Sequence, residues 1–149
     1  MHTTNEFLNT RIKELMISSP KVAHVQLGNS LEHALLVLIK SGYSAIPVLD
    51  SSYRIQGQIS TTMILDHILG LERIEYEKLG DHTVDEVMNR KIPRMKESEH
   101  FLKALELSIN HPFVCIENEE GLFLGILTRK NILALVYQYF RQQEGAKNT

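Results

Sequence analysis

The residue types best suited to binding an anion are Thr128, Arg129, Lys130 and Asn131, which directly follow an apolar stretch at a predicted helix start. Free backbone amides and the helix dipole attract negative charge there by roughly 0.3–1 kcal/mol. Arginine and lysine add charge-assisted hydrogen bonds of about 1.5–3 kcal/mol each. Cations are otherwise favoured at the C-terminal ends of helices. Their position therefore favours a bound anion over plain solvation of these two side chains.

The corresponding helix start in the first half of the chain has no cation. Its residues are Ser60, Thr61, Thr62 and Met63. The chain contains two similar halves, with a helix before YSAIPVLD and GQISTTMIL in the first and before FVCIE and GILTRKNIL in the second. A spacing of 68 positions separates the glycines that begin GQISTTMIL and GILTRKNIL. Such a spacing indicates an internal duplication. The two halves differ most at the two helix starts.

Each half is predicted to be a β-α-β-β-α unit from its hydrophobic periodicity. A two-layer unit of this kind leaves one sheet face uncovered, so we expect an α/β (α+β) fold in which two units pack around a pseudo-twofold axis with clefts between them. Asn29 and Ser98 are candidate helix caps, and Gly42 is a candidate left-handed helix end. The expected divisions are an N-terminal helix joining the first repeat (1–18), repeat 1 (19–70), a linker (71–82), repeat 2 (83–141) and a frayed tail (142–149).

The composition favours a soluble cytoplasmic protein. The 149 residues suit one compact unit of two lobes, and no apolar run is long enough to cross a bilayer. Cys115 is the single cysteine, so no intrachain disulfide can form, which fits a reducing cytoplasm. A net charge of −2 argues against broad nucleic-acid or membrane binding. The seven histidines have no metal-binding spacing, and no nucleophile has an obvious base partner, so we expect neither a metal site nor an enzyme.

The order of short strand, helix, IPVLD strand, turn and a GxISxxxI-like stretch resembles the CBS domain, and two in tandem resemble a CBS pair, or Bateman module. The resemblance covers nearly the whole chain, so we expect no separate catalytic domain in it. It implies a regulatory module that forms a disc-like homodimer. The stretches KVAHVQLGNSLEHALLVLIKSGYSAIPVLD and GLERIEYEKL are, more closely, similar to stand-alone CBS proteins of Gram-positive bacteria that bind cyclic di-AMP.

This closer resemblance implies a ligand site made from two stretches of the first repeat and the second helix start. Small alanines leave room for a flat purine, a tyrosine can stack on it, and extended backbone can read its edge. The predicted ligand-binding residues are Lys21, Val22, Ala23, Tyr43, Ser44, Ala45, Ile46, Pro47, Thr128, Arg129, Lys130 and Asn131.

CBS pairs that bind AMP or ATP usually carry an aspartate near the start of the last helix of each repeat. Its carboxylate accepts hydrogen bonds from both ribose hydroxyls. The matching residues here are Met63 and Asn131. A cyclic dinucleotide offers no free 2′,3′-diol, and an aspartate about 4 Å from its phosphate would cost on the order of 1–4 kcal/mol. The two departures therefore favour cyclic di-AMP over a mononucleotide.

The sequence thus predicts a cytoplasmic second-messenger receptor that binds one cyclic di-AMP per chain and acts on another protein in trans. The resemblance implies the stringent-response (p)ppGpp synthetase/hydrolase as the partner of the ligand-free form, and pyruvate carboxylase as one metabolic target. One alternative is an AMP- or ADP-sensing CBS protein. Another is a structural interaction module whose clefts stay empty, and occupation of the second cleft also stays open.

Overall fold

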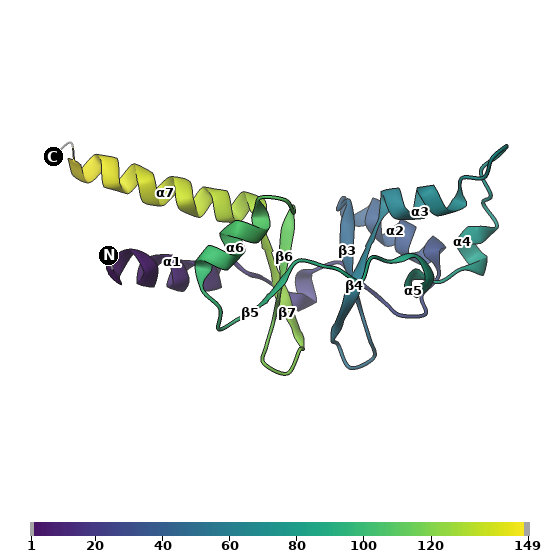
Figure 1. The fold of residues 1–149 in the computed structure, drawn as a ribbon, viewed down its shortest axis with the longest axis horizontal. Helices are drawn as coiled ribbons and strands as arrows, with labels where there is room; N and C mark the ends of the chain where they lie inside the picture. Colours follow the sequence, from purple (N-terminus) through teal and green to yellow (C-terminus); the bar gives the residue numbers. More distant parts are fainter. Residues whose placement is uncertain (1, 148–149) are drawn as a thin grey trace. The chain divides into compact units, whose positions relative to one another are not determined.

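The computed structural model describes the backbone of residues 2–147, together with most of the side chains between them (Figure 1). The described chain divides into two compact units, which we call unit 1 and unit 2. Unit 1 comprises residues 2–22, 93–120 and 124–147, and unit 2 comprises residues 23–92 and 121–123. No described helix combines the length and the apolar character needed to cross a membrane.

Unit 2 contains the first β-α-β-β-α repeat. Its sheet has the order β2-β3-β4, with β2 parallel to β3 and β3 antiparallel to β4. Ser30 caps α2 through a hydrogen bond from the His33 N–H, and Gly42 ends that helix in the left-handed conformation with φ 80°. The elements are β2 (Val25–Gln26), α2 (Leu31–Ser41), β3 (Ala45–Leu49), β4 (Ile55–Ser60), α3 (Thr61–Ile68), α4 (Lys78–Asp81) and α5 (Val84–Val87).

The core of unit 2 forms between one face of this sheet and its helices. Ile46 and Ile59 face each other across β3 and β4 and are fully buried against Leu38 of α2 and Ile64 of α3. Val84 of α5 belongs to the same cluster and is fully buried. Because this segment follows the first repeat in sequence yet fills its core, unit 2 extends past the end of that repeat.

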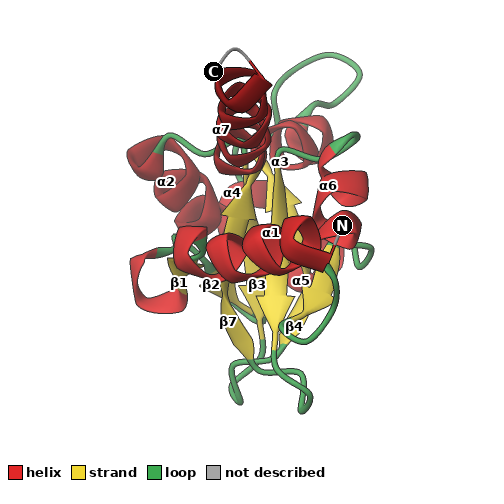
Figure 2. Cartoon of the chain, turned by 90° about the vertical axis from the view of Figure 1, so that its left-hand side faces the viewer, coloured by secondary structure: helices red, strands yellow, loops and turns green. Residues whose placement is uncertain are grey.

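Unit 1 contains the second repeat together with the N-terminal helix. Its sheet has the order β1-β7-β6-β5, with β1 antiparallel to β7 and β5 parallel to β6. Helices α1, α6 and α7 pack on one another, as Figure 1 and Figure 2 show for this unit. The elements are α1 (His2–Leu15), β1 (Ile17–Ser18), the 3-10 helix η1 (Ser19–Lys21), β5 (Arg94–Lys96), α6 (Phe101–Ser108), β6 (Phe113–Glu117), β7 (Phe123–Thr128) and α7 (Arg129–Lys147).

A glycine in each repeat allows another segment to approach a strand closely. A Cβ atom on Gly57 of β4 would lie 2.6 Å from the Asn89 carbonyl oxygen, and one on Gly125 of β7 would lie 2.2 Å from the Ile17 carbonyl oxygen. No side chain fits at either distance, so both positions require glycine. Glycine inside a strand is typical of such a close backbone approach.

The predicted mixed α/β class with two β-α-β-β-α repeats is confirmed. Two cap assignments were wrong: Ser30 caps α2 in place of Asn29, and His100 caps α6 in place of Ser98, accepting the Leu102 N–H at 3.1 Å. The final helix begins at Arg129 and continues to residue 147, beyond the predicted end near 141. The N-terminal helix also differs from expectation, because α1 packs in unit 1 with the second repeat. The repeat boundaries themselves stay a prediction.

Candidate ligand site

The start of α7 has the same backbone arrangement as the start of α3. The Arg129 N–H donates to the Pro112 carbonyl oxygen at 2.8 Å, and the Asn131 N–H donates to the Thr128 hydroxyl at 3.2 Å. At α3, the Thr61 N–H donates to the Ser44 carbonyl at 3.1 Å, and the amide three residues after the strand end donates to the Ser60 hydroxyl at 3.1 Å. The duplicated chain therefore builds one scaffold twice and varies the side chains on it.

Arg129 is positioned by the end of α6. Its Nε–H donates to the Ser108 carbonyl oxygen at 2.7 Å, and Ser108 is 4% exposed. A guanidinium carries five N–H donors, of which this bond uses one. The bond therefore orients a half-buried cation. The other four N–H donors of a guanidinium are of the kind that binds a phosphate bidentately. Lys130 beside Arg129 is exposed to solvent.

Asn131 also has a contact within unit 1. Its Nδ2 group donates to the Leu15 carbonyl oxygen at 3.5 Å, close to the end of α1. This long bond occupies part of the donor capacity of the amide, and the Oδ1 atom still offers an acceptor. Sequence reasoning considered this residue only as an uncharged ligand contact. The structure adds a role in joining α1 to α7.

In unit 2, strand alternation divides the predicted residues between two faces of the sheet. Ile46 is 1% exposed and belongs to the helix-facing core, so its side chain is committed to packing. Ala45 and Pro47 lie on the opposite face, where their register partners are Ser60 and Gln58. Pro47 is buried on that face and Ala45 is half-buried, so Ala45 is the side chain on this strand with surface left for a ligand, while Ile46 could contribute only its backbone.

Tyr43 and Ser44 precede this strand and differ in exposure. Tyr43 is half-buried and packs against the core of unit 2. The Ser44 side chain is exposed, while its carbonyl oxygen accepts the first amide of α3. A half-buried ring is compatible both with stacking on a purine and with packing in the core.

Lys21, Val22 and Ala23 lie where the chain leaves one unit for the other. Lys21 is exposed at the end of η1, whereas Val22 is 5% exposed and its N–H donates to the Ser19 carbonyl oxygen at 3.1 Å. Val22 belongs to unit 1, and Ala23 packs against the core of unit 2. The predicted residues are thus divided between the units, with Ala23 and Tyr43 to Pro47 in unit 2 and Lys21, Val22 and Thr128 to Asn131 in unit 1.

Two carbonyl groups that sequence reasoning missed position this site, those of Ser108 and Pro112. They accept from the side chain and the backbone of Arg129, respectively. A main-chain carbonyl can act this way whatever its side chain, so the residue types gave no signal. The spacing of the repeats was the available clue, because Pro112 corresponds to Ser44 when the two halves are aligned by their helix starts.

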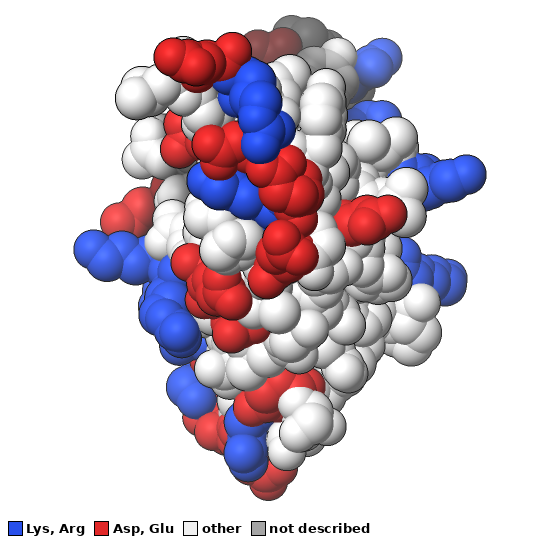
Figure 3. Space-filling model, turned by 90° about the vertical axis from the view of Figure 1, so that its right-hand side faces the viewer, with Lys and Arg blue, Asp and Glu red and all other residues white. Residues whose placement is uncertain are grey.

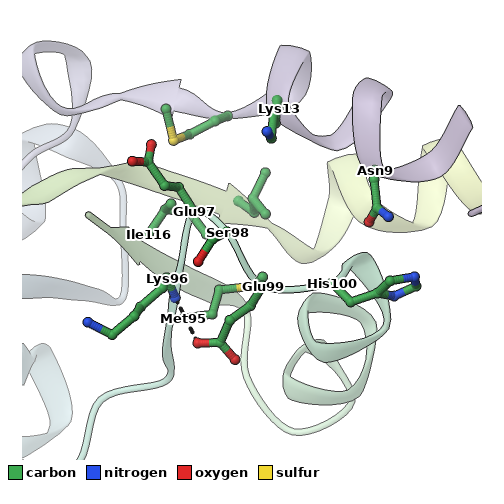
Figure 4. A pocket seen from close by; sticks show the side chains of 11 residues that line it. Asn9, Lys13, Met95, Lys96, Glu97, Ser98, Glu99, His100 and Ile116 are labelled. Atoms are coloured by element: carbon green, nitrogen blue, oxygen red, sulfur yellow. Dashed lines mark hydrogen bonds between the residues drawn. The ribbon is translucent and has the colours of Figure 1, made fainter. Parts of the chain in front are cut away.

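A cavity of about 400 Å³ lies elsewhere in unit 1, between α1 and the loop from β5 to α6 (Figure 4). Its floor is apolar, with Met95, Ile116 and Leu127, and its rim carries the carboxylates of Glu97 and Glu99. Lys13 and Lys96 line the cavity as well, so its lining carries charges of both signs. None of the predicted ligand residues lines this cavity, so its size alone does not make it the anion site.

The described residues contain no group of three or more His, Cys, Asp or Glu side chains able to hold a metal ion. Cys115 lies in β6, and its burial raises the pKa of the thiol well above the ordinary range. A thiol in this state is a weak nucleophile, because the thiolate is the reactive form. The structure therefore supports an inert core role for Cys115.

A model of the CBS domain matches residues 12–70 and 84–138, which together make up most of the chain. The chain belongs to the CBS-domain family. The tandem CBS arrangement predicted from the two repeats is thereby confirmed, with one domain model on each repeat. CBS domains are regulatory modules rather than enzymes, as the sequence predicted.

This CBS-domain chain is similar along nearly its whole length to cyclic di-AMP receptor B of Bacillus subtilis (strain 168). The identity is 51% over 138 residues, which cover 93% of this chain and 94% of that protein. The crystal structure of Listeria monocytogenes CbpB in complex with c-di-AMP has a TM-score of 0.81 and 48% identity, covering 89% of this chain and 98% of the other. A CBS domain-containing protein of Bacillus anthracis str. Ames Ancestor has a TM-score of 0.79 and 63% identity, covering 85% and 92%.

Proposed function

We propose that this chain is a receptor for cyclic di-AMP. The observation that carries the proposal is the cationic start of α7, where the Ser108 carbonyl oxygen orients Arg129 and Lys130 is exposed beside it. Two relatives of high identity support the choice of ligand, because one is named a cyclic di-AMP receptor and the other was crystallised with c-di-AMP. The corresponding start of α3 has Thr61 and Thr62 in place of the two cations.

The proposed ligand residues of the two units differ in chemistry. Arg129 and Lys130 bind the phosphates, Thr128 and Asn131 complete the helix start, and the half-buried Ala45 leaves room for a base. A micromolar ligand requires only about −8 kcal/mol in total. Two cations at about 1.5–3 kcal/mol each, together with one buried base, approach that value. The full proposed set is Lys21, Val22, Ala23, Tyr43, Ser44, Ala45, Ile46, Pro47, Thr128, Arg129, Lys130 and Asn131.

Calorimetric titration with a nucleotide panel tests the proposal. Cyclic di-AMP should bind in the micromolar range or tighter, whereas AMP and ADP should bind far more weakly. Tight AMP binding with cyclic di-AMP silent would instead establish an adenine-mononucleotide sensor. Absence of binding and of any thermal shift would leave a structural module, because a ligand at 100 times its dissociation constant stabilises a protein by about 2.7 kcal/mol.

The receptor acts in trans, by the same proposal, on a (p)ppGpp synthetase/hydrolase and on pyruvate carboxylase as a metabolic target. A ligand shifts partner binding only through its different affinities for the free and the partner-bound receptor. We expect the ligand-free form to bind the synthetase/hydrolase and cyclic di-AMP to weaken that complex. Calorimetry with the purified synthetase/hydrolase, with and without ligand, measures the effect. Equal affinity in both conditions would contradict this part of the proposal.

The receptor is proposed to be a homodimer, because helices in both units leave apolar stripes in solvent. On α7, Leu133, Tyr137 and Phe140 are 54%, 64% and 62% exposed and recur at helical spacing. On α2, Leu36 and Ile39 are 53% and 66% exposed. Exposed apolar stripes of this kind mark interaction surfaces. Size-exclusion chromatography with light scattering should give twice the chain mass of 17.1 kDa, and a stable monomer would exclude the dimer.

A further inference from the structure

The connection between α3 and α4 in unit 2, residues 69–77, is ordered by its own backbone. The Gly70 N–H donates to the Arg73 carbonyl oxygen at 2.8 Å, and the Glu75 N–H donates to the Ile68 carbonyl oxygen at 2.6 Å. Leu69 and Ile74 form an antiparallel bridge across the turn. This connection, which we call the α3–α4 loop, therefore has a shape defined by its own hydrogen bonds.

Ion pairs strengthen the same loop and use Arg73 within it and Lys78 at the start of α4. Arg73 pairs with Glu77, and Lys78 pairs with Glu75 at 2.8 Å. The Arg73 guanidinium also donates to the Ile74 carbonyl oxygen at 3.1 Å. These two basic side chains are thus paired with carboxylates and backbone of the loop, which leaves the remaining acidic side chains to set the charge of its outer surface.

The loop holds large apolar side chains in solvent. Leu71 is 106% exposed, Tyr76 is 64% exposed and Leu69 is 58% exposed. A mobile loop could expose such residues without consequence, but a loop fixed by hydrogen bonds and ion pairs presents them in one arrangement. Preorganised apolar side chains lose little conformational entropy on binding, which is what a docking surface requires.

The surroundings of this loop are strongly acidic. Residues 66–86 contain seven Asp and Glu against two Lys and Arg, a net charge of −5, whereas the whole chain carries −2. The remainder of the chain is therefore net positive, at +3. Figure 3 shows several acidic side chains across this face of unit 2, with Lys and Arg side chains between and beside them. Asp66, Glu72, Asp81 and Glu86 are among the exposed members of this group.

We propose that the α3–α4 loop is the docking surface for a partner protein with an apolar pocket bordered by Lys and Arg side chains. Leu71 and Tyr76 enter the pocket, and the acidic surroundings meet the basic border. Complementary charges of this kind steer association and select the partner. A second copy of the chain is disfavoured at this surface in a symmetric contact, because two loops of the same net negative charge would face each other. The inference deepens the proposed function, on which it rests for the existence of a partner.

A photo-crosslinking amino acid placed at position 71 of the full chain in its native cells tests the proposal, with the same group at the exposed Leu102 of α6 as the control. Position 71 should crosslink, through a basic and apolar peptide identified by mass spectrometry, to a protein that position 102 does not capture. The charge reversal Glu72→Lys should abolish that product. Crosslinking only to a second copy, to an acidic peptide or to nothing would overturn the proposal.

The captured protein, once purified, gives the quantitative test. The variant Leu71→Ala with Tyr76→Ala should weaken its binding at least tenfold, whereas Leu102→Ala should change it less than twofold. Unchanged affinity in the first variant overturns the docking surface. Because none of these residues is a proposed ligand contact, cyclic di-AMP titration of the same variants should match the unmodified chain. Absence of cyclic di-AMP binding by the unmodified chain would contradict the receptor proposal. It would not change what the crosslinking result says about the docking surface.

Discussion

The side chain of Arg129 joins the first turn of α7 to the end of α6 through a 2.7 Å hydrogen bond from its Nε–H to the Ser108 carbonyl oxygen. Basic side chains near a helix C-terminus bind the last carbonyl oxygens favourably. Arg129 thus stands at the start of one helix and at the end of another. This explains how a cation can remain at a helix start before any ligand arrives, and it gives the residue a structural role beside the proposed binding role.

Removing the side chain of Arg129 should weaken cyclic di-AMP at least tenfold, because a charge-assisted phosphate contact is worth about 1.5–3 kcal/mol. Calorimetry of Arg129→Ala measures this loss. Thermal unfolding without ligand measures the separate cost of losing the bond to Ser108. Arg141→Ala, which removes the same charge from the exposed far part of α7, is the matched control and should bind normally. Equal affinities in the two variants would show that the site lies elsewhere.

Introducing a carboxylate at position 131 should weaken binding of the cyclic dinucleotide. An aspartate about 4 Å from a phosphate costs on the order of 1–4 kcal/mol, which is a loss of fivefold or more. Titration of Asn131→Asp with cyclic di-AMP measures it. Asn131→Ala separates the charge from the bond to the Leu15 carbonyl oxygen, because it removes the amide without adding a charge. If the aspartate variant bound as well as the alanine variant, position 131 would not face a phosphate.

Alanine at either close-approach glycine should destabilise the fold. At Gly125 the added Cβ would lie 2.2 Å from the Ile17 carbonyl oxygen, and at Gly57 it would lie 2.6 Å from the Asn89 carbonyl oxygen. Relieving such contacts requires backbone shifts that typically cost about 1–3 kcal/mol. Urea unfolding should show this cost for both variants. Gly80→Ala in α4, where nothing lies within 4 Å, should be neutral or stabilising by up to about 1 kcal/mol.

The repeated elements were predictable because both repeats show their periodicity and turns in the sequence. The cap of α2 was placed one residue early, since Asn29 and Ser30 are both good capping residues and only the backbone decides between them. At α6 the cap is His100, a residue type that capping preferences do not favour. Local sequence preferences therefore located these two helices but did not identify the residue that caps each of them.

The placement of α1 could not be read from the sequence order. In unit 1 the Phe101 N–H at the start of α6 donates to Asn9 Oδ1 at 2.7 Å, a bond that spans 92 positions. In unit 2 the Leu31 N–H at the start of α2 donates to the His82 carbonyl oxygen at 3.0 Å. Each repeat thus receives its partner segment from outside its own sequence, and long-range contacts of this kind leave no periodic signal.

Part of the candidate site was predictable for the same reason. The charge difference between the two helix starts can be read directly from Arg129 and Lys130. The separation of Ile46 from Ala45 and Pro47 required the strand register, because an almost continuously apolar strand does not reveal which face is the core. The family resemblance named all three residues as ligand-binding. In the structure the side chain of Ile46 packs in the core.

Asp85 should make the stability of unit 2 depend on acidity. The Gly28 N–H donates to its Oδ1 atom at 2.9 Å, and this bond, followed by one from the Thr83 side chain, lowers the pKa of the carboxyl below its ordinary value of 3.8. A lowered folded-state pKa means that the stabilisation is complete above the ordinary value and is lost as the pH falls through the folded value. Urea unfolding of wild type and Asp85→Asn, followed from neutral pH downward, should show a difference that shrinks below pH 3.8. Asp66→Asn removes one charge from exposed α3 and should follow the wild-type curve. A difference that stayed constant with pH would mean that the amide side chain replaces the carboxylate fully at Gly28 or that the bond carries no charge-dependent energy.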